Sequence, residues 1–195
     1  MKTIGITGGI GSGKTTCCRL FEKLGIPVYY ADTRAKKLML SSRPLKKQIK
    51  ELLGDKAYHS NGRPNRPYIA SKIFTDKKLL KQMNALVHPA VGRDVIEWVQ
   101  AQKAPYVLYE ATLLVENGSY KNFNKLIVVT CPKEERIRRV MNRDGVNKEA
   151  VLARMKNQLP EKKKIAVADM LIDNSGELAL EGQIQKVHGA ILSLE

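Results

Sequence analysis

Short apolar runs alternate with helical patterns along most of this chain. Five runs have the composition and length of buried strands, at residues 3–7, 27–30, 106–109, 126–129 and 170–172. Apolar residues recur at helical spacing over 14–24, where Gly25 marks the stop, and over 178–194. Short apolar strands separated by helices are typical of a parallel sheet covered on both faces. The pattern therefore predicts an α/β fold whose five-stranded parallel sheet is flanked by helices.

Two long basic stretches interrupt this alternation. Residues 34–104 form a helical insertion between the second and third strands, with 16 Lys+Arg against 5 Asp+Glu. Residues 133–164 follow the fourth strand and carry 11 Lys+Arg against 5 Asp+Glu. These stretches account for the formal net charge of +15, so the positive charge is localised rather than spread over the surface. Such a charge indicates anionic partners, which are either nucleic acids or phosphorylated small molecules.

Composition and length are those of an ordinary folded protein. Hydrophobic residues make up 43% and charged residues 27% of the 195 positions, which excludes a disordered chain and a membrane bundle. This length fits one domain with an inserted subdomain. No apolar run approaches the roughly 18 residues that cross a bilayer, and the N-terminus lacks the apolar core of a secretory signal. We therefore expect a cytoplasmic protein with no membrane partner.

The cysteines do not suggest a disulfide framework. Cys17 and Cys18 are adjacent, and Cys131 stands alone. This spacing fits neither paired disulfides nor a metal-binding motif, and it favours a reducing compartment. We expect all three to be small buried residues of helices and strands.

A glycine-rich segment directly after the first strand carries the clearest motif. Residues 8–15 fit the P-loop pattern G-x-x-x-x-G-K-[ST], between a strand and a helix as that motif requires. The glycines let successive N–H groups turn towards an anion, and the start of the helix adds positive potential. Lys14 can reach the β- and γ-phosphates of ATP, and Thr15 can offer its hydroxyl to Mg²⁺. The predicted ATP-binding residues of this segment are Gly8, Gly9, Gly11, Ser12, Gly13, Lys14, Thr15 and Thr16.

Two acidic residues follow predicted strands at the edge of the sheet where the P-loop lies. Glu110 comes directly after the third strand, where a metal-binding acid of a P-loop enzyme would stand; the alternative is a strand-end acid facing solvent. Asp32 follows the second strand, at the carboxyl edge where α/β proteins bind ligands. It can cap the helix that begins at Thr33, and it can also act as a general base for a substrate hydroxyl. The two roles are compatible, and the nearby P-loop favours the base.

A basic helix is predicted after the fourth strand, and it carries Arg136, Arg138, Arg139 and Arg143. Arg139 and Arg143 are four residues apart and share a face. In a phosphoryl-transfer enzyme such a helix is a natural lid that neutralises transition-state charge, whereas the alternative is a solvated basic face. Elsewhere, the dipeptide at 88–89, His-Pro, predicts a helix boundary.

Taken together, these features resemble the dephospho-coenzyme A kinase family, from residue 4 to near the C-terminus. The matching elements are Ile4 to Thr15, Tyr30-Ala31-Asp32, Gly62 to Arg66, Val87-His88-Pro89-Ala90, Leu113-Leu114-Val115-Glu116, the lid residues Arg139, Arg143, Arg154 and Gln158, and the closing Ala168-Asp169 and Ile172-Asp173-Asn174. The P-loop alone is specific for nucleotide binding, and the whole set at these spacings is highly specific for the family.

The resemblance implies a P-loop kinase with a nucleotide-binding core at 1–33 and 105–195, a helical lid at about 133–164 and a helical subdomain at 34–104 for the acceptor. It implies transfer of the γ-phosphate of ATP to the ribose 3′-hydroxyl of dephospho-coenzyme A, the last step of coenzyme A synthesis. Partners are then ATP, with Mg²⁺, and dephospho-coenzyme A, and we expect a monomer. The implied catalytic residues are Asp32, Lys14, Arg139 and Arg143; Asn174 joins the ATP site; Asp32, Arg66, His88, Leu113 and Glu116 bind the acceptor; Thr15 and Glu110 bind the metal.

Two rival functions remain open at this point. Another small-molecule P-loop kinase, such as one acting on nucleoside monophosphates, shares the P-loop and the lid. A nucleic-acid-binding NTPase is suggested by the net charge, but aromatic residues are only 6% and no RNA- or DNA-binding motif is present. No N-K-x-D guanine element is present either. We therefore expect no nucleic-acid partner.

Overall fold

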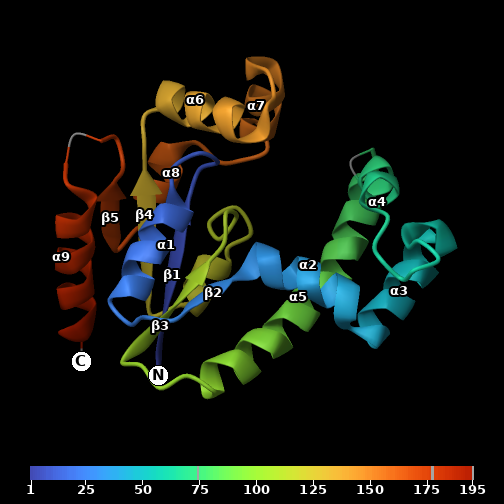
Figure 1. The fold of residues 1–195 in the computed structure, drawn as a ribbon, viewed down its shortest axis with the longest axis horizontal. Coiled ribbons are helices and arrows are strands. Elements are labelled where there is room, and N and C mark those ends of the chain that lie inside the picture. The colour runs from blue at the N-terminus through green and yellow to red at the C-terminus, as the bar shows by residue number, and fades with distance from the viewer. Residues whose placement is uncertain (74, 177, 195) are drawn as a thin grey trace. The chain divides into compact units, whose positions relative to one another are not determined.

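The structure is a computed structural model that describes residues 1–73, 75–176 and 178–194. Over these residues the chain divides into two compact units (Figure 1). The first unit comprises Met1–Tyr30 and Gln102–Glu195, and the second comprises Ala31–Ala101. The insertion therefore spans Ala31–Ala101 rather than the expected 34–104, which places Asp32 in the second unit.

A parallel sheet forms the centre of the first unit. Its strands are β1 (Lys2–Gly8), β2 (Val28–Tyr30), β3 (Tyr106–Glu110), β4 (Lys125–Thr130) and β5 (Met170–Asp173). Within the described residues the sheet has five strands in the order β2-β3-β1-β4-β5, and all neighbours are parallel. This confirms the predicted five-stranded parallel sheet. Because β1 lies in the middle, the segment that follows it emerges at the centre of the carboxyl edge, where open α/β sheets bind ligands.

Apolar residues on both faces of the sheet explain why its strands are continuously hydrophobic. In β4, Ile127 and Val129 join a core with α1 (Lys14–Lys23) and α9 (Leu180–Leu192), whereas Leu126 and Val128 join a second core with Leu114. The side chains alternate between the faces because successive residues of a strand point in opposite directions. The sheet is thereby buried on both faces, and this packing fixes the positions from which the segments at its edge begin.

The predicted lid region contains α6 (Lys133–Asp144), α7 (Lys148–Met155) and α8 (Glu161–Ile165). Ile137 and Val140 of α6 pack with Val151 of α7 in a small core of their own. Asn147 caps α7 by accepting a hydrogen bond from the N–H of Ala150. A short 3₁₀ helix, η2 (Ser119–Asn122), lies between β3 and β4.

The second unit is helical and has a separate core. It contains α2 (Ala31–Ser41), α3 (Arg43–Leu53), the 3₁₀ helix η1 (Asp55–Ala57), α4 (Arg66–Ile73) and α5 (Lys77–Gln100). The buried residues of this core are Leu45, Ile49, Leu53, Ala57, Tyr58, Ile69, Met83 and Ala90. Over the described part of the chain, no helix has the length and hydropathy needed to cross a membrane.

The helix boundary predicted at 88–89 is wrong, because Pro89 lies inside α5. Met83 and Ala90, on either side of this position, are both buried in the core of the second unit. A proline in a helix interior costs about 3 kcal/mol or more and commonly bends the helix, and α5 bends along its length in Figure 1. Apolar packing on both sides of the proline thus keeps the helix continuous, which a local dipeptide pattern does not reveal.

The three thiols are buried and unpaired with one another, as the sequence suggested. Burial raises the pKa of the Cys17 thiol to about 12, and it also raises the pKa of Cys18 and of Cys131. Because the thiolate is the reactive form, we expect no native thiol to react with Ellman's reagent at pH 8, and all three to react in denaturant. A thiol that titrates at once in the native protein would contradict this arrangement.

Candidate active site

The segment between β1 and α1 has the geometry of an anion-binding loop. Gly11 has φ +81° and Gly13 has φ +87°, a backbone region that other residues rarely adopt. Ser12 closes a turn by donating its N–H to the carbonyl of Gly9 at 3.0 Å. The first N–H groups of an α-helix have no acceptor within the helix, and the helix dipole makes this end positive. In α1 the N–H groups from Thr16 onward already donate within the helix, because Thr16 and Cys17 both bond to the carbonyl of Gly13. The loop and the helix start can therefore bind phosphate together.

Lys14 and Glu110 form a buried pair of opposite charges beside this loop. Lys14 is 8% exposed, and its Nζ donates to the carbonyl of Gly8 at 3.0 Å. Nζ also lies 4.0 Å from Oε1 of Glu110, the last residue of β3, which is 7% exposed. The alternative of a solvent-facing acid at Glu110 is therefore wrong. The pair holds the ammonium group at the loop, where it can contact a bound phosphate.

The donor groups at this edge fit a magnesium ion that is shared with a nucleotide. Among the described residues, no group of three or more His, Cys, Asp and Glu side chains could hold a metal by itself. Mg²⁺ usually takes one or two protein oxygens and completes its shell with water and substrate phosphates. Thr15, exposed in the first turn of α1, and the buried carboxylate of Glu110 supply oxygens of this kind.

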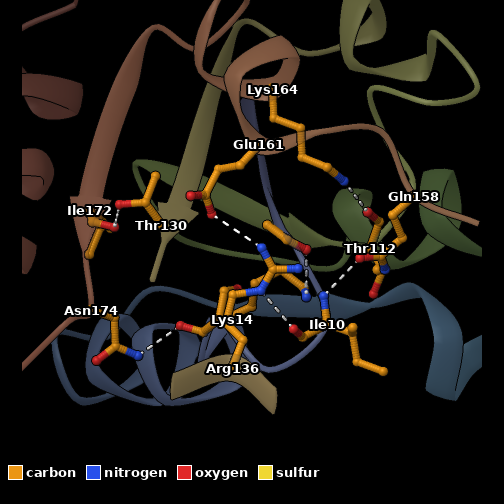
Figure 2. A network of polar contacts seen from close by, with 12 residues as sticks. Ile10, Lys14, Thr112, Thr130, Arg136, Gln158, Glu161, Lys164, Ile172 and Asn174 are labelled. Carbon is orange, nitrogen blue, oxygen red and sulfur yellow. Dashed lines mark hydrogen bonds and ion pairs between the residues drawn. The ribbon is translucent and has the colours of Figure 1, made fainter. Parts of the chain in front are cut away.

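Arg136 contacts the loop, a role that the sequence analysis did not assign to this residue of the basic helix. Its Nε donates to the carbonyl of Ile10 at 3.0 Å, and its Nη1 donates to Oε1 of Glu161 at 3.4 Å. Oε1 of Gln158 accepts the N–H of Ile10 at 3.0 Å, so both backbone polar groups of Ile10 are bound (Figure 2). The basic helix was evident in the sequence, but nothing in it separates the buried Arg136 from the exposed Arg138.

Glycine at positions 9 and 11 makes room for Arg136. A Cβ at Gly9 would overlap the Arg136 guanidinium, and a Cβ at Gly11 would lie 2.5 Å from the Arg136 carbonyl oxygen. A Cβ at Gly13 would overlap the amide of Asn174. Glycine at 11 is thus required by the backbone of α6, whereas the crowding at 9 and 13 comes from the ends of the Arg136 and Asn174 side chains.

Arg139 and Asn174 reach the loop from α6 and from the end of β5. Asn174 donates from Nδ2 to the carbonyl of Ser12 at 2.8 Å, and its own carbonyl accepts Nη2 of Arg139 at 3.0 Å. Nε of Arg139 donates to Glu135 at 2.8 Å. Hydrogen bonds from Arg138 and Arg139 lower the pKa of Glu135 to about 2, so this carboxylate stays charged and orients Arg139 at neutral pH.

Arg143 has different surroundings from Arg139. Its side chain is 63% exposed, and its guanidinium donates to Asp144 at 2.8 Å. Asp144 also accepts from Arg154 at 2.6 Å, and the hydrogen bonds from both arginines lower its pKa to about 2. In this arrangement Arg139 is bound to the loop through Asn174, whereas Arg143 belongs to an exposed charge cluster on the lid.

The residues assigned to the acceptor are divided between the two units. Asp32, Arg66 and His88 are exposed residues of the second unit. In the first unit, Leu113 is 45% exposed and Glu116 is mostly buried. Within its own unit, each of these residues except Glu116 is therefore accessible to a ligand.

The helix cap predicted at Asp32 is wrong. Strand β2 ends at Tyr30 and α2 begins at Ala31, so Asp32 lies in the first helical turn and not before it. The strand passes into the helix without a loop, and the carboxylate is favoured there by the positive end of the helix. Two residues further on, Arg34 donates from Nε to Oδ2 of Asp94 at 2.7 Å, which ties α2 to α5.

A P-loop at the carboxyl end of a central parallel strand, a lysine buried at that loop and an arginine-bearing helical lid define a P-loop kinase. Comparison with known proteins identifies which one. The family model for dephospho-CoA kinase matches residues 2–179, so the chain belongs to the dephospho-CoA kinase family of phosphotransferases. As kinases, members of this family use ATP.

Individual relatives agree with the family match. The chain is 37% identical over 182 residues to the dephospho-CoA kinase of Salinibacter ruber, with 91% of each chain covered. A crystal structure from Thermus thermophilus is similar at a TM-score of 0.85 and 36% identity, covering 98% of this chain and 96% of that one. The dephospho-CoA kinase from Campylobacter jejuni is similar at a TM-score of 0.70 and 29% identity, covering 98% of each.

Two glycines with nearly equal positive φ allow a matched test of the loop. In Gly11→Ala the positive φ costs about 1–2 kcal/mol, and the new methyl also meets the backbone of Arg136. In Gly25→Ala the φ of +78° carries the same cost, but nothing lies within 4 Å of the new methyl. We expect both variants to melt earlier and only Gly11→Ala to lose ATP affinity in a calorimetric titration. Equal ATP affinity in the two variants would show that the close approach to Arg136 does not shape the loop.

Proposed function

We propose that this protein transfers the γ-phosphate of ATP to the 3′-hydroxyl of the ribose of dephospho-coenzyme A, giving coenzyme A and ADP. This is the last step of coenzyme A synthesis. The observation that carries the proposal is a complete P-loop, with its buried lysine and its arginine contacts, in a chain that matches the dephospho-CoA kinase family over residues 2–179.

The donor half of the reaction belongs to the first unit. The N–H groups of the loop and of the first turn of α1 bind the phosphates, and Lys14 contacts the β- and γ-phosphates. Thr15 and Glu110 would hold Mg²⁺, which neutralises phosphate charge when bound. Asn174 supports the loop from β5 through its bond to the carbonyl of Ser12. The buried position of Lys14, at the loop that binds the phosphates, supports its assignment to catalysis.

The acceptor half of the reaction is assigned chiefly to the second unit. The oxygen of the ribose 3′-hydroxyl forms a bond to the γ-phosphorus, and Asp32 accepts the proton of that hydroxyl. At the same time the bond between the γ-phosphorus and the oxygen that bridges it to the β-phosphate breaks, and ADP leaves. The place of Asp32, two residues after the carboxyl end of β2, supports its role as the base. Arg66, His88 and Leu113 bind the acceptor in this proposal, and the family resemblance implies the same contact for Glu116.

The lid supplies positive charge to the phosphoryl group in transfer. Arg139 is supported in this role by its bond to Asn174, which contacts the loop. Arg143 is assigned the same role on the family resemblance, and it has to leave Asp144 to perform it. Most of the rate acceleration then comes from positioning and from electrostatic stabilisation. The monomeric state, the cytoplasmic location and the absence of a nucleic-acid partner stay predictions.

A coupled assay tests the proposal directly. We expect ADP release from ATP and Mg²⁺ to depend on dephospho-coenzyme A, with a nucleoside monophosphate panel and shikimate as control acceptors. Mass spectrometry of the product should show one added phosphoryl group at the ribose. Equal turnover with a control acceptor, or ATP hydrolysis stimulated by nucleic acid alone, would overturn the proposal.

We expect removal of the Lys14 charge to lower both the turnover and the stability of the protein, for two different reasons. Lys14→Met should lower kcat by at least about 10²–10³-fold, because a donor to the transferring phosphoryl group is lost. It should also lower the free energy of unfolding by about 1–3 kcal/mol, because Glu110 stays buried without its ammonium neighbour. The double variant Lys14→Met/Glu110→Gln should regain stability but not turnover. Recovery of turnover in the double variant would show that Lys14 acts only through the fold.

Replacing Asp32 by asparagine isolates the proposed general base. Asparagine keeps the size of the side chain at an exposed position, so the melting temperature and the ATP affinity should change little. It cannot accept a proton, so kcat should fall by about two orders of magnitude or more. Steady-state kinetics beside an ATP titration and a melting curve measure all three. Turnover within about threefold of wild type would exclude Asp32 as the base.

A further inference from the structure

A buried ion pair joins the segment after β3 to the lid helix α8. Lys164 is 1% exposed, although it ends a run of three lysines of which Lys162 and Lys163 are exposed. Its Nζ lies 2.5 Å from Oε1 of Glu116 and 3.4 Å from the carbonyl of Thr112. The Glu116 side chain is only 14% exposed. A buried ammonium is tolerated when a charged partner and further acceptors compensate for lost water, and both are present here.

Glu116 also fixes the chain directly before α8. The same oxygen, Oε1, accepts the N–H of Leu159 at 3.0 Å. Leu159 follows Gln158, whose side chain accepts the N–H of Ile10 in the P-loop at 3.0 Å. Two hydrogen bonds and two adjacent residues, Leu159 and Gln158, therefore connect Glu116 to the P-loop.

A second connection runs through the same segment. Glu161 begins α8 and accepts from Arg136 at 3.4 Å, and Arg136 donates to the carbonyl of Ile10 at 3.0 Å. Figure 2 shows Arg136 between Ile10 and Glu161, with Gln158 and Lys164 on neighbouring parts of the lid. Both polar groups of the Ile10 backbone thus depend on residues 158–161, and this stretch is held by Glu116 and Lys164.

We propose that Lys164 and Glu116 are positioning residues for the nucleotide site. The ion pair holds residues 158–161 in place, and through Gln158, Glu161 and Arg136 it sets the orientation of the Ile10 peptide groups in the P-loop. The catalytic effect of this positioning rests on the proposed kinase function. It gives Glu116 a task on the ATP side, in place of the acceptor contact that the family resemblance implied.

The orientation of the carboxylate supports this assignment. Oε1 has two donors, whereas Oε2 is buried and has no hydrogen-bond partner among the described residues. The charge and the accepting oxygen of Glu116 therefore both serve the lid. Glu116→Gln keeps an oxygen for the N–H of Leu159 but removes the charge that Lys164 requires. Lys164→Met removes the ammonium and keeps a side chain of similar length.

The test compares ATP affinity with acceptor affinity. In each single variant we expect the Kd for ATP, measured by calorimetry without acceptor, to rise roughly tenfold, a size that coupled residues commonly show. The KM for dephospho-coenzyme A should change less than about twofold. The double variant Glu116→Gln/Lys164→Met leaves no unpaired charge and keeps the acceptor for Leu159, so its ATP affinity should return towards wild type.

A second ion pair in the same unit supplies a matched control. Asp169 accepts from Lys125 Nζ at 2.9 Å and from the N–H of Leu126 at 2.8 Å, the same two kinds of donor that Glu116 has. Lys125 begins β4 and Asp169 precedes β5, so this pair lies at the edge of the sheet opposite the P-loop. Asp169→Asn should lower the melting temperature without changing the Kd for ATP.

The outcomes separate the two proposals. A raised KM for dephospho-coenzyme A with an unchanged Kd for ATP would overturn the inference and return Glu116 to the acceptor site. If a single variant does not fold, Gln158→Leu removes the last link without leaving a buried charge, and an unchanged Kd for ATP in that variant would also overturn it. Because the Kd is measured without acceptor, weakened ATP binding in an enzyme inactive on dephospho-coenzyme A would support the inference while refuting the proposed function.

Discussion

The peptide groups of a phosphate-binding loop must satisfy two demands at once. Some N–H groups have to point at the ligand, so the loop cannot bond to itself as a helix or strand does, and its other polar groups need partners from outside. Here the carbonyl of Ile10 is bound by Arg136, its N–H by Gln158, and the carbonyl of Ser12 by Asn174. These three partners lie more than a hundred residues after the loop in the chain, so the shape of the loop depends on tertiary contacts within the first unit.

The parallel sheet is what makes such a convergence possible. Parallel strands end at the same edge, and segments that follow β3, β4 and β5 contact the loop after β1 or the lysine beside it. Strand β3 ends in Glu110 beside Lys14, β4 leads into α6 with Arg136, and β5 is followed by Asn174. A buried lysine, held by Glu116, then fixes the stretch that carries Gln158. Nucleotide binding and lid structure are thus parts of one hydrogen-bonded assembly.

The features that the sequence predicted depend on local pattern, and the ones that it missed depend on tertiary contacts. The five strands and the P-loop follow from apolar runs and from glycine spacing, which act over a few residues. By contrast, nothing in the run of three lysines distinguishes the buried Lys164 from its exposed neighbours. The helix boundary predicted at Pro89 is wrong because a dipeptide does not reveal the packing of Met83 and Ala90 around it. The helix cap that the sequence allowed at Asp32 fails because β2 passes into α2 with no loop.

The contact between Arg136 and the glycines implies that substitutions at these positions are interdependent in evolution. At Gly9 the three atoms nearest to a new methyl group all belong to the guanidinium of Arg136, which is the flexible end of a side chain. A shorter residue at 136 therefore opens the way to alanine at 9, whereas alanine arising first is selected against. At Gly11 the obstacle is the Arg136 backbone, which no side-chain change removes. Whether alanine is tolerated at position 9 thus depends on which substitution came first. At position 11 alanine is not tolerated in either order.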